Sequence, residues 1–216
     1  MGTVFMRTIA ISGKDFPGLV SRVSGTADYT VKTATPDTAS FTTVFRVDGH
    51  PASTLDIAIS DQGRSIAFSG KRSLNHEGSG LTYNTFLWGN PPSNLKVGDT
   101  WTVNLVQPWE SGGPGKQTVR VEWVNPKNHT ICLRRDGDSE GFFEDEAKEL
   151  TINKGGKPLK VAIVPGKTHW TGYTIFKEGL IISDELMATR NLQLCADDQI
   201  YPADEREYMM LNSRSF

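Results

Sequence analysis

Cysteine and histidine are scarce in this chain of 216 residues, which holds two cysteines and four histidines. A local zinc motif needs several such residues at short spacing. Cys195 has no cysteine or histidine near it and Cys132 has only His129, three residues before it, while the histidines themselves are far apart, at positions 50, 76, 129 and 169. Two interpretations of the cysteines remain: one disulfide in an oxidising compartment, or two thiols packed as small apolar side chains.

Long apolar runs and an excess of one charge sign are also missing. No run approaches the roughly 20 apolar residues of a membrane-spanning helix, so we predict no transmembrane segment. The formal net charge is -2 and the basic residues are scattered, which predicts no nucleic-acid partner. The first 18 residues lack the apolar core of a signal peptide. This predicts a cytoplasmic protein, or a periplasmic or secreted one if a signal peptide has been removed.

Recognisable catalytic motifs are lacking as well. The chain has no G-x-S-x-G sequence, and the glycine-rich stretch at 111–116 lacks the spacing of a phosphate-binding loop. The adjacent carboxylates at 184–185 and 197–198 would point to opposite faces of a strand, which argues against an acid–base pair. These absences favour binding over catalysis.

Alternation of apolar and polar residues is the pattern that the chain does have. Leu55, Ile57 and Ile59 share one face of an expected strand, and Val119, Val121 and Trp123 share one face of another. Turn signals separate such segments about every 10–12 residues. We therefore predict an all-β fold, an antiparallel meander that forms a curved sheet, half-barrel or barrel with little helix.

Two further segments have local sequence signals of their own. Residues 81–88 resume the strand pattern, whereas the tail from Pro202 has proline and acidic residues where a helix would begin. That tail is predicted as a short helix or a loose end. We predict a single β domain over 1–216, with a subdivision near residue 75 (1–75 and 76–216) as the alternative.

Two sequence stretches together resemble a known group of bacterial proteins. One is L-K-V-G-D-T-W at 95–101, followed by two strands, and the other is G-Y-T-I-F-K-E-G-L-I-I-S-D at 172–184. They resemble uncharacterised periplasmic proteins and lipoprotein-carrier-like half-barrels, which are built as curved antiparallel sheets. The resemblance implies a concave, apolar face that holds a lipid-like or extended ligand, and it implies no catalytic residue.

Aromatic residues are the best candidates for ligand contacts. Aromatic rings on a sheet can stack on sugars or line an apolar pocket, although the same rings also serve as core. Trp88 and Trp109 are expected at strand ends, beside a glycine and a proline. Our candidates for ligand binding are Trp88, Trp109, Trp170 and Tyr173, for either an apolar or a carbohydrate ligand.

The acidic stretch from Asp136 is the candidate metal site. Asp136, Asp138 and Glu140 place carboxylates at alternate positions before a glycine, as in a calcium loop. The bidentate carboxylate that such a loop needs at its twelfth position is replaced by Ala147. The alternative is a solvated acidic hairpin loop without metal, and we expect no other cofactor.

Three functional hypotheses follow from the sequence. The first is a non-enzymatic bacterial envelope or secreted protein that binds a lipid-like or extended ligand on a concave sheet face. The second is a structural or assembly module that contacts a protein partner through sheet edges or the tail at 209–211. The third is a β-fold hydrolase or carbohydrate-active enzyme whose acidic residues converge only in space.

Overall fold

The computed structural model describes residues 2–14, 16–60, 65–68, 83, 85–105, 112–141, 148–154, 156–196 and 198–214. Strands make up most of these residues, and short helical turns make up little. The strands are β1 (Gly2–Gly13), β2 (Phe16–Ala34), β3 (Thr38–Val47), β4 (Ser53–Ser60), β5 (Ser65–Phe68), β6 (Thr100–Leu105), β7 (Gly112–Asn125), β8 (Thr130–Gly141), β9 (Lys148–Lys154), β10 (Lys157–Lys177), β11 (Leu180–Ala196) and β12 (Gln199–Arg214). The helical turns are α1 (Thr85–Trp88) and the 3-10 turn η1 (Pro126–Asn128).

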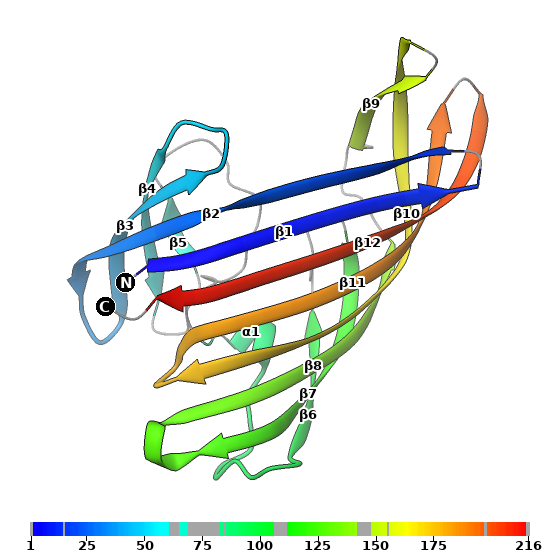
Figure 1. Ribbon diagram of the computed structural model, residues 1–216. Helices are drawn as coiled ribbons and strands as arrows, with labels where there is room; N and C mark the ends of the chain where they lie inside the picture. Colours follow the sequence, from blue (N-terminus) through cyan, green and yellow to red (C-terminus); the bar gives the residue numbers. More distant parts are fainter. Residues whose placement is uncertain are drawn as a thin grey trace.

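All these strands belong to one antiparallel sheet with the order β5-β4-β3-β2-β1-β12-β11-β10-β8-β7-β6, and β9 pairs with β10 outside this path. Most neighbours in the sheet are also neighbours in the sequence, as expected of a meander. The main exception is the pairing of β1 with β12, which runs from Gly2 opposite Arg214 to Ser12 opposite Asp204. It brings both ends of the chain to the middle of the sheet (Figure 1). The predicted all-β, curved antiparallel sheet is confirmed.

The two faces of the sheet differ in burial. On β11, Leu186, Ala188 and Leu192 alternate with exposed residues, and they face the side on which Trp88 of α1 packs. We call this side the concave face, because the sheet curves around α1 (Figure 1). On β10, a bulge between Pro165 and Thr168 shifts the register by one residue. Apolar side chains therefore stay on the concave face along the whole of β10, because a one-residue insertion reverses the alternation.

Two apolar clusters lie along β10 and β11 on the concave face, and a smaller third one surrounds Phe41 of β3. The first surrounds α1 and includes Trp88, Trp170 and Leu186, each about 1% exposed. The second lies at the opposite ends of β10 and β11 and includes Val161 and Leu194, both with no exposed surface. Burial of such side chains supplies the main stabilisation of the fold, at roughly 25 cal/mol per Å² of apolar surface.

Close packing around Trp170 requires glycine on the neighbouring strands. Gly137 of β8 is directly opposite Trp170, and a Cβ atom there would lie 2.5 Å from Trp170 Cε2. A Cβ atom at Gly115 of β7 would lie 3.0 Å from Trp170 Cη2. The indole therefore covers β8 and β7 at two positions where any larger residue would displace it.

Several local predictions were wrong. The expected strand at 81–88 contains α1 instead, and the tail from Pro202 is neither a helix nor a loose end but part of β12. The stretch from Asp136, expected as a loop, continues β8 to Gly141. In both strands long-range pairing overrides the local signal, because β12 is held between β1 and β11 and β8 between β7 and β10. The subdivision near residue 75 falls outside the described residues and stays a prediction.

Both cysteines are free thiols, so the disulfide interpretation is not what the structure shows. Cys132 is buried, and burial together with the nearby carboxylate of Glu122 raises the pKa of its thiol. Cys195 lies on β11 at the far end of the sheet.

We predict that Gly137→Ala lowers the free energy of unfolding by about 2–3 kcal/mol, because the new methyl group collides with the indole of Trp170. Gly18→Ala on β2 is the matched control, since a Cβ atom there would meet only Ile11 O, at 3.7 Å. Urea unfolding followed by circular dichroism measures both changes. Equal stability of the two variants would contradict this account of the packing.

Candidate functional site: the concave face of the sheet

The structure brings together two of the four predicted ligand-binding residues. Trp88 and Trp170 belong to the same buried cluster on the concave face, and each is 1% exposed. Tyr173 lies on the opposite, convex face of β10 and is 45% exposed, with Arg134 over its ring. Trp109 lies outside the described residues. Trp88 and Trp170 therefore belong to the buried core on the concave face, whereas Tyr173 lies on the opposite face of the sheet.

Hydrogen bonds fix α1 against this face. The indole N–H of Trp101 donates to Trp88 O at 2.5 Å, and the amide of Gln117 donates to Leu87 O at 2.8 Å. The Gln117 Oε1 atom accepts from the indole N–H of Trp170 at 2.9 Å. Because Gln117 is 3% exposed, this amide links α1 to the centre of the sheet away from water.

Tyr83 closes the same cluster at its edge. Its hydroxyl donates to Gly89 O at 2.9 Å, and its ring centroid is 5.5 Å from that of Phe176. Burial raises the pKa of Tyr83 to about 12, because a charged phenolate would lose its hydration there.

A partly buried ion pair lies beneath Trp88. The Nη2 atom of Arg135 is 2.8 Å from both carboxylate oxygens of Asp184, and the hydroxyl of Thr174 donates to the same carboxylate. The guanidinium of Arg135 is 5.1 Å from the centre of the Trp88 ring, a cation–π distance. The carboxylate and the aromatic face together compensate the positive charge of Arg135, so this group serves to position α1.

A second set of charged residues, Arg7, Arg190, Glu205 and Glu207, separates these two apolar clusters. We call this set the charged belt. Arg7 of β1 pairs with Glu207 of β12 at 2.5 Å, and Arg190 of β11 lies 3.9 Å from Glu205 of β12. Arg190 and Glu207 are each 3% exposed. On β11, Arg190 stands between Ala188 of the first cluster and Leu192 of the second. The concave face is therefore apolar at both ends and charged in the middle.

The charged belt was not predicted from the sequence, although the position of Arg190 in its strand is a signal for it. The concave positions of β11 are Leu186, Ala188, Arg190, Leu192 and Leu194. A single arginine in the apolar phase of an alternating strand is unusual, because a buried charge is costly without a partner.

Toward the N-terminal strands the apolar part of the concave face becomes partly exposed. Val23 of β2 lies opposite Arg7 and is 39% exposed. Ile9 and Leu19, on the same face, are partly buried against the second cluster. Val23 is thus an accessible apolar side chain of the concave face, next to Arg7.

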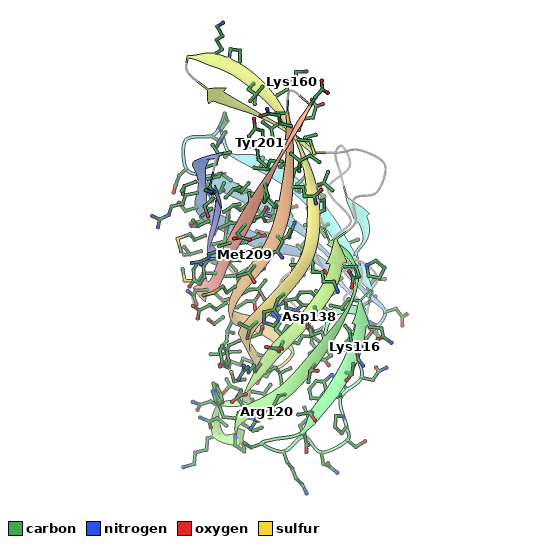
Figure 2. All side chains as sticks on the ribbon, turned by 90° about the vertical axis from the view of Figure 1, so that its right-hand side faces the viewer. Lys116, Arg120, Asp138, Lys160, Tyr201 and Met209 are labelled. Atoms are coloured by element: carbon green, nitrogen blue, oxygen red, sulfur yellow. The ribbon has the colours of Figure 1, made fainter. Side chains whose placement is uncertain are left out.

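The candidate metal residues lie on the convex face of β8. Asp138 is 3.0 Å from His169 Nδ1, Glu140 is 3.3 Å from Lys167 Nζ, and Asp136 is 3.9 Å from Arg134 Nη2. Asp138 and the neighbouring Lys116 project from this surface (Figure 2). No group of three potential ligand residues converges within the described part of the chain.

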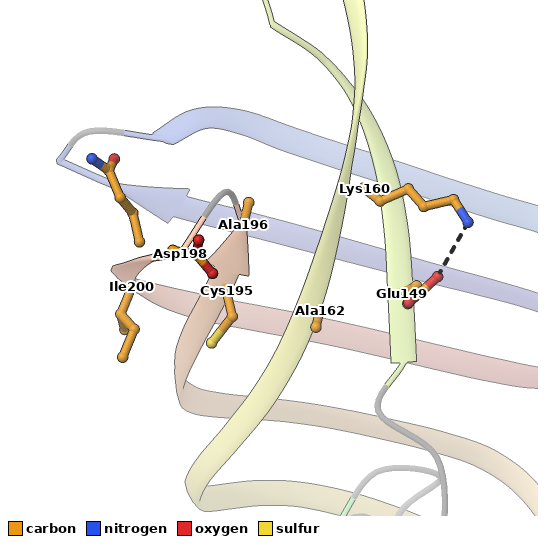
Figure 3. Close-up of a pocket in the computed structure, with 8 residues that line it drawn as sticks. Glu149, Lys160, Ala162, Cys195, Ala196, Asp198 and Ile200 are labelled. Carbon is orange, nitrogen blue, oxygen red and sulfur yellow. Dashed lines mark ion pairs between the residues drawn. The ribbon is translucent and has the colours of Figure 1, made fainter.

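Two shallow hollows lie near the hairpin that joins β11 to β12, and both include Ile200. One, of about 440 Å³, is lined by residues such as Cys195, Ala162 and Ile200, with the Lys160–Glu149 ion pair at its rim (Figure 3). The other, of about 550 Å³, lies beside the bulge in β10 and is lined by Asn191 and Gln193 among others. Most of these side chains are on the convex face, so the hollows are separate from the concave surface.

Comparison with known proteins gives no family for this chain: no family model and no curated protein matches it. OmpF of Salmonella typhi, in a complex with daunomycin, has 7% identity and a TM-score of 0.25, covering 98% of this chain and 96% of that one. A hot dog fold protein of unknown function from Alicyclobacillus acidocaldarius has 12% identity and a TM-score of 0.14, covering 100% and 81%. A DUF3598 family protein of unknown function from Nostoc punctiforme has 9% identity and a TM-score of 0.16, covering 95% and 94%.

These similarities are too low to support any statement about function. The resemblance to lipoprotein-carrier-like half-barrels therefore stays a prediction. The β-rich character of the chain is shown by the strands of its own structure. Among the described residues, no helix is long and apolar enough to span a membrane.

We predict that the phenol of Tyr83 ionises only near pH 12, about two units above the ordinary value of 10. Because the folded state holds this proton more tightly, the stabilisation is present below pH 10 and is lost as the pH rises toward 12. The difference in tyrosinate absorbance between the wild type and Tyr83→Phe, followed against pH, measures this ionisation. A difference spectrum with its midpoint near pH 10 would contradict the burial of the phenol.

Proposed function

We propose that this protein is a non-enzymatic binding protein that holds a lipid-like or otherwise extended, apolar ligand on the concave face of its sheet. The observation that carries this proposal is the partial exposure of Val23 on the concave face, on the same strand as Leu19, which packs against the second apolar cluster. Apolar surface in a concave setting, with a few polar groups at fixed positions, is typical of small-molecule sites.

The charged residues of the concave face support binding rather than catalysis. Arg135 and Arg7 each contact a carboxylate, of Asp184 and Glu207, within hydrogen-bond distance. A general acid or base must be within reach of a substrate and have a pKa suited to its task. Carboxylates held by arginine in this way are suited to fixing the sheet and orienting a ligand.

We further propose that the protein acts in the bacterial envelope or is secreted. This part of the proposal rests on the sequence resemblance at 95–101 and 172–184 alone. Detection of the native protein in periplasmic or culture fractions of its source organism tests it, and recovery only from the cytoplasm would overturn it.

We predict that Val23→Asn weakens the binding of an apolar probe about fivefold, because a polar amide replaces part of the apolar contact surface. Val20→Asn is the matched control, since Val20 lies on the same strand but faces the convex side and is 76% exposed. Titration with tetradecanoate, followed by isothermal calorimetry, measures both affinities.

Native mass spectrometry of the gently purified protein tests the proposal independently. A bound mass that is lost on denaturation supports it, and the size of that mass separates a lipid from a metal or a sugar. Equal loss of affinity in the Val20 and Val23 variants, or no binding by the wild type, would count against the concave site.

A further inference from the structure

A row of polar side chains crosses the concave face in register. Arg190 of β11 lies opposite Thr168 of β10, and Thr168 lies opposite Ser139 of β8. Directly paired residues of an antiparallel sheet have Cβ atoms about 5 Å apart on the same face. The three side chains therefore form one continuous polar group, next to Glu205 on the β12 side.

Two members of this row have hydroxyl groups without a partner. Thr168 is 1% exposed and Ser139 is 5% exposed, and neither hydroxyl has a hydrogen-bond partner among the described residues. A buried hydroxyl without a partner costs about 1–3 kcal/mol, so native proteins rarely retain one. Two such hydroxyls side by side, adjacent to a buried arginine, indicate that something polar completes the group.

The surroundings of the row define where that partner would lie. On β10, Thr168 stands between Trp170 of the first apolar cluster and Ile163 of the second. Gly115 continues the row on β7, where a Cβ atom would lie 2.9 Å from Ser139 Cβ. The polar row is thus enclosed by apolar surface on both sides, and the indole of Trp170 covers its β7 end, since a Cβ atom at Gly115 would lie 3.0 Å from Trp170 Cη2.

We propose that the Arg190–Thr168–Ser139 row binds the anionic head group, a carboxylate or a phosphate, of the apolar ligand held on the concave face. This inference rests on the proposed function and names the chemistry of the ligand. The guanidinium and two hydroxyls are all hydrogen-bond donors, which is the set that an oxyanion requires. Glu205 and the head group share the guanidinium from opposite sides.

The position of the row fits a ligand whose tail reaches the accessible side chain of Val23. From Arg190 the sheet continues through Glu205 and Ile11 to Leu19 of β2, four residues along the strand from Val23. The three strand spacings from β11 to β2 span roughly 14 Å, and the four residues from Leu19 to Val23 span roughly 13 Å along β2. A fatty-acyl chain can therefore run from the row to Val23.

We predict that the double substitution Thr168→Val and Ser139→Ala weakens the binding of tetradecanoate and tetradecyl phosphate at least tenfold. It should change the binding of tetradecan-1-ol less than twofold, because hydrogen bonds to the neutral hydroxyl of the alcohol are weaker than hydrogen bonds to an oxyanion. Fluorescence titration of each probe against the wild type and the variant measures these ratios. The two anionic probes also separate a carboxylate source from a phosphate source.

Thr43→Val is the matched control. Thr43 is a threonine on β3 with no exposed surface, and its hydroxyl also lacks a partner among the described residues, but it is not paired with Arg190. We expect it to bind all three probes as the wild type does. Thr168→Ser, which keeps the hydroxyl, should retain most of the affinity, and neither threonine-to-valine change should lower the melting temperature of the ligand-free protein.

The outcomes separate this inference from the proposed function. If the wild type binds the alcohol as tightly as the two anions, or if the double variant binds tetradecanoate normally, the head-group site is overturned while apolar binding stands. If the wild type binds none of the three probes, both proposals fall. A selective loss of the anionic probes in the double variant, with Thr43→Val unchanged, supports the site.

Discussion

The pairing of β1 with β12 is the interaction on which the rest of the structure depends. It joins β2–β5, which follow β1 in the sheet, to β11, β10 and β8–β6, which follow β12. Without it the two halves would be separate meanders, each with a long unpaired edge strand in the middle of the present molecule. The contact links segments near the two ends of the chain, from Gly2 opposite Arg214 onward. It therefore forms at a high cost in chain entropy, which extensive pairing and burial must offset.

This pairing also creates the concave face as a single surface. Arg7 of β1 meets Glu207 of β12 across it, so the charged belt is built from strands at opposite ends of the sequence. The belt lies between the two apolar clusters of β10 and β11. Buried ion pairs rarely add much net stability, because the desolvation of both charges offsets their attraction. Their retention in the middle of this face is better explained by specificity, either for the strand register or for a ligand.

The packing of Trp170 depends on glycines in two neighbouring strands. Its indole fits over Gly137 and Gly115 and donates to Gln117, which in turn holds α1. Nothing in the sequence around Trp170 shows that glycines face it from β8 and β7. Pairing between strands, rather than any single strand, determines which side chains can be large.

The sequence by itself determined the fold class, because alternation at Leu55–Ile59 and Val119–Trp123, with short turns between strands, is a local property of the chain. It also contained the single arginine in the apolar phase of β11. Tertiary structure alone decided that the tail at 202–214 is a central strand, that Trp88 is core and Tyr173 convex, and that Arg190, Thr168 and Ser139 form one row. These facts depend on register between segments far apart in sequence, and register is set by the burial of a whole face rather than by local preference.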